Sequence, residues 1–493
     1  MKTNLKLAAV TAVLPLLALS CAKDGYDGLY AYESVGESHS EPASGDKFEG
    51  IAENPFVKTT DESTSTFSID ADGASYAIMR RYLNDGLTPN PESVRIEEFL
   101  NYFTFDYPDP TGDETVAINA ETGACPWNKE HRLLRLGLKG KSLADNELPA
   151  ANYVFLIDVS GSMCSTDKLP LLKSSLTTLL DYLQADDYVS IVTYSGTVQK
   201  LLEATKVHDK AKIKAAIAKL DATGSTAGGK AIEMAYEEAL GTYIEGGNNR
   251  VIMGTDGDFN VGVTSTDALV ELVEGYAEKG VYLTVCGFGS GNLNDAMIKK
   301  ICIAGNGTYQ YIDSEEEMAK VFVQEASKFV SVANDTKVQV KFNPKTIDSY
   351  RLIGYERRVM KNSDFEDDTK DAGEIGAGQT ISALYELIPA ESYKDGADCG
   401  SFECRYKLSL SDTRSRSLST GISASEGEMS ENLSFAAGVA SYGMVLLGSE
   451  YKGSSSFDLA SSLVKSSLSF DPHGYRAGLL DLIDKAKELS ETK

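Results

Sequence analysis

The sequence YVFLIDVSGSM at Tyr153–Met163 joins a continuous apolar run to a short polar loop. Such a run predicts a strand buried on both faces, which is typical of parallel sheets, whose ligand sites lie beyond the carboxyl ends of the strands. Asp158 stands at that end, and Ser160 and Ser162 follow it at alternate positions. One carboxylate and two hydroxyls offer hard oxygen ligands to a hard divalent cation. The stretch therefore predicts a metal site at the edge of a parallel sheet.

Two further stretches extend this set of oxygen ligands. Thr226 lies in GSTAGG, a loop that opens a predicted helix, and Asp256 follows an apolar strand in VIMGTDGDFN. The alternative is that Asp158 and Ser160 only cap the next helix, as Asp and Ser do in many short loops. Capping explains one loop and leaves the other two without a role, so we favour the metal site.

With these residues in this order, the chain resembles the von Willebrand factor type A (VWA) domain and its metal-ion-dependent adhesion site. The resemblance implies a doubly wound, Rossmann-like α/β fold with a mostly parallel sheet. It also implies that the ion is Mg²⁺, or another divalent cation such as Mn²⁺ or Ca²⁺, and that one coordination position stays open for an Asp or Glu of a protein partner. The implied metal residues are Asp158, Ser160, Ser162, Thr226 and, often through water, Asp256.

The chain has 493 residues, of which 42% are hydrophobic, and a formal net charge of −26. This length has room for about three domains, and the apolar content is sufficient for buried cores. The acidic balance argues against nucleic acid as a partner, because a phosphate backbone requires a basic surface. A partner that is cationic, or is bridged by a metal ion, is compatible with this charge.

Residues 1–20 have the build of a secretory signal, with a basic start and an apolar run from Leu7 to Leu19 that is too short to span a bilayer. Cys21 follows the small Ser20, which resembles a bacterial lipoprotein signal in which Cys21 is lipidated and becomes the mature N-terminus. Leu19 departs from that pattern, and the alternatives are an uncleaved anchor or a soluble secreted form. We therefore expect a lipid-anchored protein of the bacterial cell envelope, in the outer membrane, on a face that the sequence does not identify.

Composition divides the rest of the chain into four parts. Residues 21–54 are rich in Gly, Ser, Asp and Glu, which predicts a flexible tether. Residues 55–148 mix helices with two alternating strands, residues 149–333 form the VWA domain, and residues 334–493 contain strands followed by helices. The predicted helices include one capped by Asn90 that runs through Phe103, the last VWA helix at Glu315–Val330, and a packed apolar helix around Leu433–Leu447.

The two strands before the VWA domain, Thr115–Glu121 and Leu133–Lys139, are too few for a stable sheet. We therefore predict that the VWA domain is inserted in one β-rich, sandwich-like module built from both sides of it. This arrangement resembles the integrin β subunit. The predicted partner strands after the domain are Val338–Phe342, Tyr350–Tyr355, Thr380–Leu387 and Cys404–Leu410.

A fuller resemblance is carried by STFSIDADGASY, VRIEEFLNYF and HRLLRLGLKG before the VWA domain and by VKFNPKTIDSYRLIGYE and DPHGYRAGLLDLI after it. These stretches are similar to the YfbK family, a family of uncharacterised bacterial lipoproteins that carry a VWA domain. The resemblance covers nearly the whole mature chain. It implies the fold and the metal site, and it implies no cellular role.

The run from Gly224 to Lys230 spells most of a phosphate-binding loop, so a nucleotide-hydrolysing enzyme is one alternative function. Ala231 stands where such a loop needs a magnesium-binding hydroxyl, and the preceding segment is predicted to be a helix rather than a strand. None of the four His lies near a GxSxG motif. We therefore expect no enzymatic activity, and the second alternative is a structural envelope component whose metal only orders its loops.

Six cysteines follow Cys21, and they allow 15 pairings, among which the sequence does not choose. None has the CxxC spacing or the His partner of a zinc site. Cys399 and Cys404, close together near a strand start, are the pair that suggests a local disulfide. The six are Cys125, Cys164, Cys286, Cys302, Cys399 and Cys404.

Overall fold

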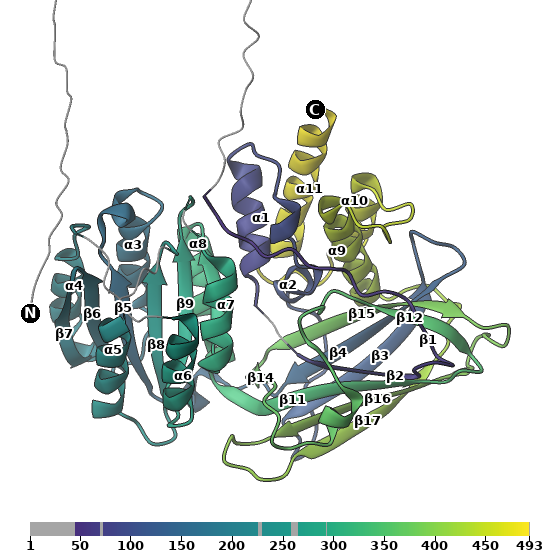
Figure 1. The fold of residues 1–493 in the computed structure, drawn as a ribbon, viewed down its shortest axis with the longest axis horizontal. Coiled ribbons are helices and arrows are strands. Elements are labelled where there is room, and N and C mark those ends of the chain that lie inside the picture. The colour runs from purple at the N-terminus through teal and green to yellow at the C-terminus, as the bar shows by residue number, and fades with distance from the viewer. Residues whose placement is uncertain (1–44, 70–71, 225–228, 258–264, 292, 493) are drawn as a thin grey trace, which may run out of the picture. The chain divides into compact units, whose positions relative to one another are not determined.

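The computed structural model describes residues 45–69, 72–224, 229–257, 265–291 and 293–492 (Figure 1). The predicted signal segment, Cys21 and the tether up to residue 44 lie outside the described residues. Residues 45–54 are bound to the folded part of the chain. Asp46 pairs with Arg81 at 2.8 Å, and the Asn54 side chain donates to the carbonyl of Gly354 at 2.9 Å. The tether prediction is therefore wrong over residues 45–54.

Residues 151–329, called the inserted domain below, are built on a six-stranded sheet with the order β10-β9-β8-β5-β6-β7. All neighbours in this sheet are parallel except β7, which forms an antiparallel edge next to β6. The predicted doubly wound, mostly parallel α/β fold is thus confirmed. The strands are β5 (Ala151–Asp158), β6 (Tyr188–Ser195), β7 (Thr197–Lys206), β8 (Asn248–Thr255), β9 (Tyr282–Phe288) and β10 (Thr308–Ile312).

Helices cover both faces of this sheet, so its strands carry apolar side chains on both sides. On β5, Val154 and Leu156 enter the core formed with α5, α6 and α7, while Phe155 and Ile157 enter the core formed with α3 and α4. The helices are α3 (Leu169–Leu179), α4 (Lys210–Ala218), α5 (Gly229–Gly241), α6 (Thr266–Ala277), α7 (Asp295–Ala304) and α8 (Glu315–Ala319).

The remainder of the described chain forms a β-sandwich whose two sheets enclose a third core. The first sheet has the order β1-β12-β15-β4-β3, and the second has the order β13-β2-β11-β16-β17, with β14 beside β11. The strands are β1 (Val57–Lys58), β2 (Thr64–Ser68), β3 (Val116–Ala124), β4 (Arg132–Gly140), β11 (Ser331–Phe342), β12 (Ile347–Ile353), β13 (Val359–Met360), β14 (Gly373–Gly376), β15 (Thr380–Pro389), β16 (Asp398–Lys407) and β17 (Arg416–Ser423).

Both sheets of the sandwich join strands from before and after the inserted domain. β4 pairs with β15 in the register Leu136↔Ala383, and β2 pairs with β11 in the register Phe67↔Val338. The structure therefore confirms the predicted insertion. The chain leaves the sandwich after β4 and returns through β11, so the inserted domain is attached at both of its ends.

A helical layer covers the face of the first sheet that points away from the sandwich core. α9 is buried within this layer, as predicted for a packed helix, and contacts α2 and α10. Among the residues that the structure describes, none of the helices combines the length and the apolar character that a bilayer span requires. The helices are α1 (Ala74–Asn84), α2 (Ile96–Asn101), α9 (Glu431–Leu447), α10 (Phe457–Lys465) and α11 (Tyr475–Glu491).

Two helix predictions are wrong in their bounds. Asn90 does accept from the N–H of Glu92, but it caps only a short 3-10 turn, and α2 starts at Ile96 because Arg95 is extended, with its own N–H donating to Ser75. The predicted helix Glu315–Val330 keeps α geometry only over α8, and continues as a π turn and a 3-10 turn.

The predicted disulfide between Cys399 and Cys404 is also wrong, because both cysteines are free and lie in the same strand, β16. Five residues of strand separate their Cα atoms by about 17 Å, whereas a disulfide needs less than about 7 Å. All six cysteines after Cys21 are free, and five of them are buried, the exception being Cys164.

Asn101 joins α2 to the sandwich, since its Oδ1 accepts the N–H of Ser382 in β15 at 2.8 Å in a buried position. We expect Asn101→Leu to lower the free energy of unfolding by about 2–3 kcal/mol, because that N–H loses its partner. Chemical unfolding followed by circular dichroism measures this. The exposed Asn84→Leu is the matched control, for which a change within about 0.5 kcal/mol is expected. Equal losses in both variants would contradict this role of Asn101.

Candidate metal centre

Four of the five predicted metal residues, Asp158, Ser160, Ser162 and Asp256, lie at or just beyond the carboxyl edge of the parallel sheet. Asp158 is the last residue of β5, and Asp256 directly follows β8. These strands are parallel neighbours in the register Ile157↔Gly254, so the two carboxylates emerge side by side at one edge. Ser160 and Ser162 lie in the loop after β5, in and around a short 3-10 turn. Thr226 lies outside the described residues.

The Asp158 side chain is fully buried, and only one of its two carboxylate oxygens accepts a hydrogen bond of normal geometry. Its Oδ1 accepts the N–H of Ser160 at 2.8 Å. Its Oδ2 is buried and makes no hydrogen bond of normal geometry with the described residues. Burial, reinforced by the charge of Asp256 and opposed by Ser160 and by the hydroxyl of Tyr194, raises the pKa of Asp158 to about 6. A buried carboxylate oxygen that lacks a hydrogen bond of normal geometry is suited to bind a cation.

The two hydroxyls face each other beside this carboxylate. Ser160 Oγ and Ser162 Oγ are 2.9 Å apart, and Ser160 is buried while Ser162 is exposed to solvent. The described residues hold no cluster of three or more His, Cys, Asp or Glu side chains suited to a metal. A cation here would therefore depend on hydroxyl and water ligands in addition to the carboxylates, which is the ligand chemistry that Mg²⁺ accepts.

Two side chains that the sequence did not reveal complete the surroundings of the site. The Lys168 ammonium donates to Asp256 Oδ2 at 2.9 Å, and both side chains are buried. Tyr194, at the end of β6, is in register with Asp158, and burial together with the Asp158 charge raises its pKa well above the usual value. Tyr194 was detectable from its place at the end of an apolar strand, whereas Lys168 resembles any loop lysine.

The loop after β9 holds Lys168 against the site. Gly289 has a φ of +65°, and a Cβ there would come within 2.3 Å of Lys168 Cε. A larger residue would thus displace the lysine. Gly289 therefore lets the loop after β9 lie close to Lys168 beside the metal edge.

The described part of the Gly224–Lys230 run does not have the context of a phosphate-binding loop. Residues 225–228 lie outside the described residues. The element before the run is α4, a helix, where a phosphate-binding loop follows a strand. Ala231 is buried in the core of the inserted domain, and Lys230 is exposed.

Comparison with known proteins adds family information to this geometry. A von Willebrand factor model matches residues 42–135, a von Willebrand factor type A domain model matches residues 152–325, and a model of the C-terminal part of the uncharacterised protein YfbK matches residues 327–489. Uncharacterised protein YfbK of Escherichia coli strain K12 is 38% identical over 471 residues, which cover 90% of this chain and 82% of that protein. The chain belongs to the YfbK family.

The VWA match places all five predicted metal residues of this YfbK-family protein inside one VWA domain. Human inter-alpha-trypsin inhibitor heavy chain H3 is 29% identical over 180 residues, which cover 34% of this chain and 20% of that protein. A solved structure, von Willebrand factor type A from Catenulispora acidiphila, is 17% identical with a TM-score of 0.43, and the match covers 78% of this chain and 91% of that chain. BatB from Bacteroides thetaiotaomicron is 24% identical with a TM-score of 0.32, over 36% and 98% of the two chains.

The Lys168–Asp256 pair leads to a prediction about the metal-free state. Lys168→Met should lower the stability of the metal-free protein by about 3–5 kcal/mol, because a buried carboxylate loses its counter-charge. The same change should tighten Mg²⁺ binding about tenfold, since the ion then neutralises a charge that nothing else offsets. Thermal unfolding and calorimetric titration measure the two effects. Lys210→Met, which removes only an exposed pair with Asp181, is the control, and weaker Mg²⁺ binding in Lys168→Met would disprove the idea.

Proposed function

We propose that this protein is a lipid-anchored protein of the bacterial cell envelope whose VWA domain binds a protein partner through a magnesium ion. The observation that carries the proposal is the buried Asp158 carboxylate, whose Oδ2 is left without a well-formed hydrogen bond next to a second buried carboxylate, Asp256. A structural loop would not need to hold these two acids together. Asp158, Ser160, Ser162, Asp256 and, beyond the described residues, Thr226 are the residues that would hold the ion.

The charges around the site favour an acidic ligand for the bound ion. Lys168 neutralises Asp256, so Asp158 contributes the single uncompensated charge of this set. A divalent cation held there would keep a net positive charge and attract a carboxylate of a partner. Such a bond in a partly desolvated groove is worth more than a surface ion pair, which typically contributes about 0–1 kcal/mol.

The rival function is a structural envelope component that uses the metal only to order its loops. Capture of partners from envelope extract, with Mg²⁺ and with a chelator, separates the two functions. Adhesion requires that a partner is captured in Mg²⁺, released by the chelator and displaced by a soluble peptide rich in Asp and Glu. A partner that stays bound in chelator would support the structural function instead.

Asp158→Asn tests the metal residues directly. It keeps the volume of the side chain, and the amide oxygen can still accept the N–H of Ser160, so the fold should persist. Mg²⁺ affinity should fall about 100-fold because a charged ligand is lost. Calorimetric titration measures the affinity, and Thr226→Ala should weaken it less because a neutral ligand is removed. Asp167→Asn, an exposed acid of the same loop, is the control. Unchanged Mg²⁺ affinity in Asp158→Asn would rule out the metal site.

Cys21→Ser tests the lipid anchor. The substituted protein should move from the membrane fraction to the soluble fraction, because serine accepts no lipid at this position and no described helix could replace the anchor. Fractionation of cells followed by immunoblotting measures the distribution. Retention in the membrane fraction would show that the attachment lies elsewhere.

A further inference from the structure

A cavity of about 260 Å³ lies between the inserted domain and the sandwich, away from the metal edge. It is lined by Arg250 near the start of β8, Tyr282 at the start of β9 and Thr308 at the start of β10. Asp158 and Asp256 lie beyond the opposite, carboxyl ends of the parallel strands. The cavity is therefore a separate site, and its volume greatly exceeds the roughly 10–15 Å³ that one bridging water requires.

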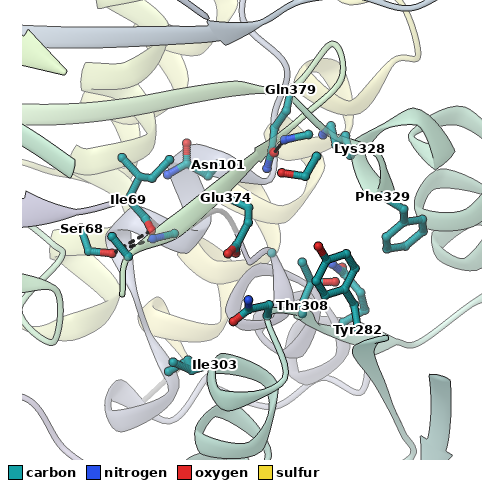
Figure 2. Close-up of a pocket in the computed structure, with 18 of the residues that line it drawn as sticks. Ser68, Ile69, Asn101, Tyr282, Ile303, Thr308, Lys328, Phe329, Glu374 and Gln379 are labelled. Atoms are coloured by element: carbon teal, nitrogen blue, oxygen red, sulfur yellow. Dashed lines mark hydrogen bonds between the residues drawn. The ribbon is translucent and has the colours of Figure 1, made fainter. Parts of the chain in front are cut away.

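The sandwich side of the cavity is formed by β14, which directs Glu374 inward. A Cβ on Gly373 would lie 2.0 Å from the carbonyl oxygen of Ile69, and a Cβ on Gly376 would lie 2.0 Å from that of Lys328. The two glycines let β14 fit tightly between its neighbours, which fixes the residue between them. Figure 2 shows the Glu374 carboxylate pointing into the space towards Thr308 and Tyr282.

The Oε1 of Glu374 is buried and makes no hydrogen bond with the described residues. Five basic side chains line the cavity: Arg250, Lys320, Lys328, Arg357 and Arg358. Arg357 pairs with Glu49 at 3.1 Å, outside the cavity lining. The Arg250 guanidinium donates to Thr284 Oγ1 at 2.9 Å and to the carbonyl of Phe329 at 3.2 Å. Lys320 and Lys328 both pair with Glu325, at 2.9 and 2.7 Å. A buried carboxylate oxygen without a hydrogen bond is costly, so this position favours an added hydrogen-bond donor with a positive charge.

Two exposed apolar side chains line the cavity, beside exposed polar ones such as Arg357 and Asp371. Ile303, at the end of α7, is 41% exposed, and Val359, in β13, is 54% exposed. Within the described part of the chain, six large hydrophobic side chains are exposed, and two of them, Ile303 and Val359, line this cavity. An aliphatic chain could pack between them, while a charged end reaches Glu374.

We propose that this cavity binds an aliphatic ammonium group, with its hydrocarbon chain between Ile303 and Val359 and its ammonium on the Glu374 carboxylate. The hydroxyls of Thr308 and Tyr282 on the opposite wall are further acceptors for the N–H donors of the ligand. A lysine side chain of a peptide and a free aliphatic amine share this chemistry. This inference goes beyond the proposed magnesium-dependent adhesion and does not depend on it.

Calorimetric titration of the full mature chain with pentylammonium, pentan-1-ol and pentanoate tests the chemistry. Pentylammonium should bind, pentan-1-ol and pentanoate should bind at least tenfold more weakly, and Glu374→Gln should weaken pentylammonium about tenfold with no change for the alcohol. Glu450→Gln, an exposed acid, is the matched control. No binding of pentylammonium at about 10 mM, or equal binding by wild type and Glu374→Gln, would overturn the proposal.

A capped tripeptide, Ala-Lys-Ala, distinguishes the two sources of the ammonium group. Tighter binding of the tripeptide than of pentylammonium identifies a peptide lysine as the ligand, and weaker binding identifies a free amine. Titrations with Asp158→Asn keep this test separate from the metal site. Pentylammonium binding should be unchanged in that variant, whereas a parallel loss would mean that the probe binds at the metal edge and would reject the cavity.

The dependence on pH gives an independent readout. Burial, together with Asp371 and with Asp335 of β11, raises the pKa of Glu374 to about 8, and Arg250 of β8 opposes the shift. Burial followed by Asp335 raises the pKa of Asp371 to about 6, and Tyr282 of β9 also interacts with Glu374. Lys328, Arg357 and Arg358 are further charged groups that line the same cavity. The ligand binds the ionised carboxylate, so its affinity should rise about tenfold per pH unit below pH 8 and then level off. A pH-independent affinity between pH 6 and 8 would contradict the assignment of Glu374.

Discussion

The pairing of β4 with β15 is the constraint on which the rest of the structure depends. These strands come from opposite sides of the inserted domain, and their eight paired positions run from Lys139↔Thr380 to Arg132↔Leu387. Without this ladder, β3 and β4 would be separated from β12 and β15, the strands of the same sheet that follow the inserted domain. The β2–β11 ladder repeats the closure in the second sheet. Each end of the inserted domain is therefore connected to a strand that is held within the sandwich.

α1 reinforces this arrangement by contributing to two cores. Ala77 and Ile78 enter a core of the inserted domain, while Met79 and Leu83 enter the core of the helical layer. Between them, Arg80 bonds to Asp313 just after β10, at 2.7 Å from its Nε. The helix thus joins the amino-terminal part of the chain to the segment that leads out of the inserted domain. Any movement of that segment would disturb charged and apolar contacts together.

The fold was largely predictable because its main signals are local. Continuous apolar runs such as Val154–Ile157 predict buried parallel strands, and the insertion followed from a shortage of strands on one side. β17 was missed because its exposed edge position imposes little apolar alternation on the sequence RSLSTGIS. The irregular segment after α8 was missed because its sequence KVFVQEASKF contains no Gly or Pro to mark the change from α to π and 3-10 turns.

The candidate site also contains residues that the sequence predicts and residues that it does not. Asp158, Ser160 and Ser162 form a pattern within one loop, and Asp256 could be added because parallel strands end at a common edge. Lys168 and Glu374 carry no such pattern. Their importance comes from what surrounds them, namely Asp256 in one case and the close packing of β14 in the other. Sequence spacing identifies residues that act as a motif, and it does not identify single residues placed by contacts between distant elements.

The insertion also determines the order in which the protein can fold during synthesis. The side chain of Thr66 in β2 bonds to Asn362, which follows it by 296 residues, so the early sandwich strands emerge long before their partners exist. The inserted domain is built mainly from strand–helix units that are neighbours in the sequence. Its strands therefore find their partners soon after they are synthesised. It is therefore expected to fold first and to bring the two halves of the sandwich close together, which shortens the effective loop that β4 and β15 must close. Until then β2 and the edge of β4 that pairs with β15 remain unpaired, and unpaired strand edges of this kind favour aggregation of a nascent chain.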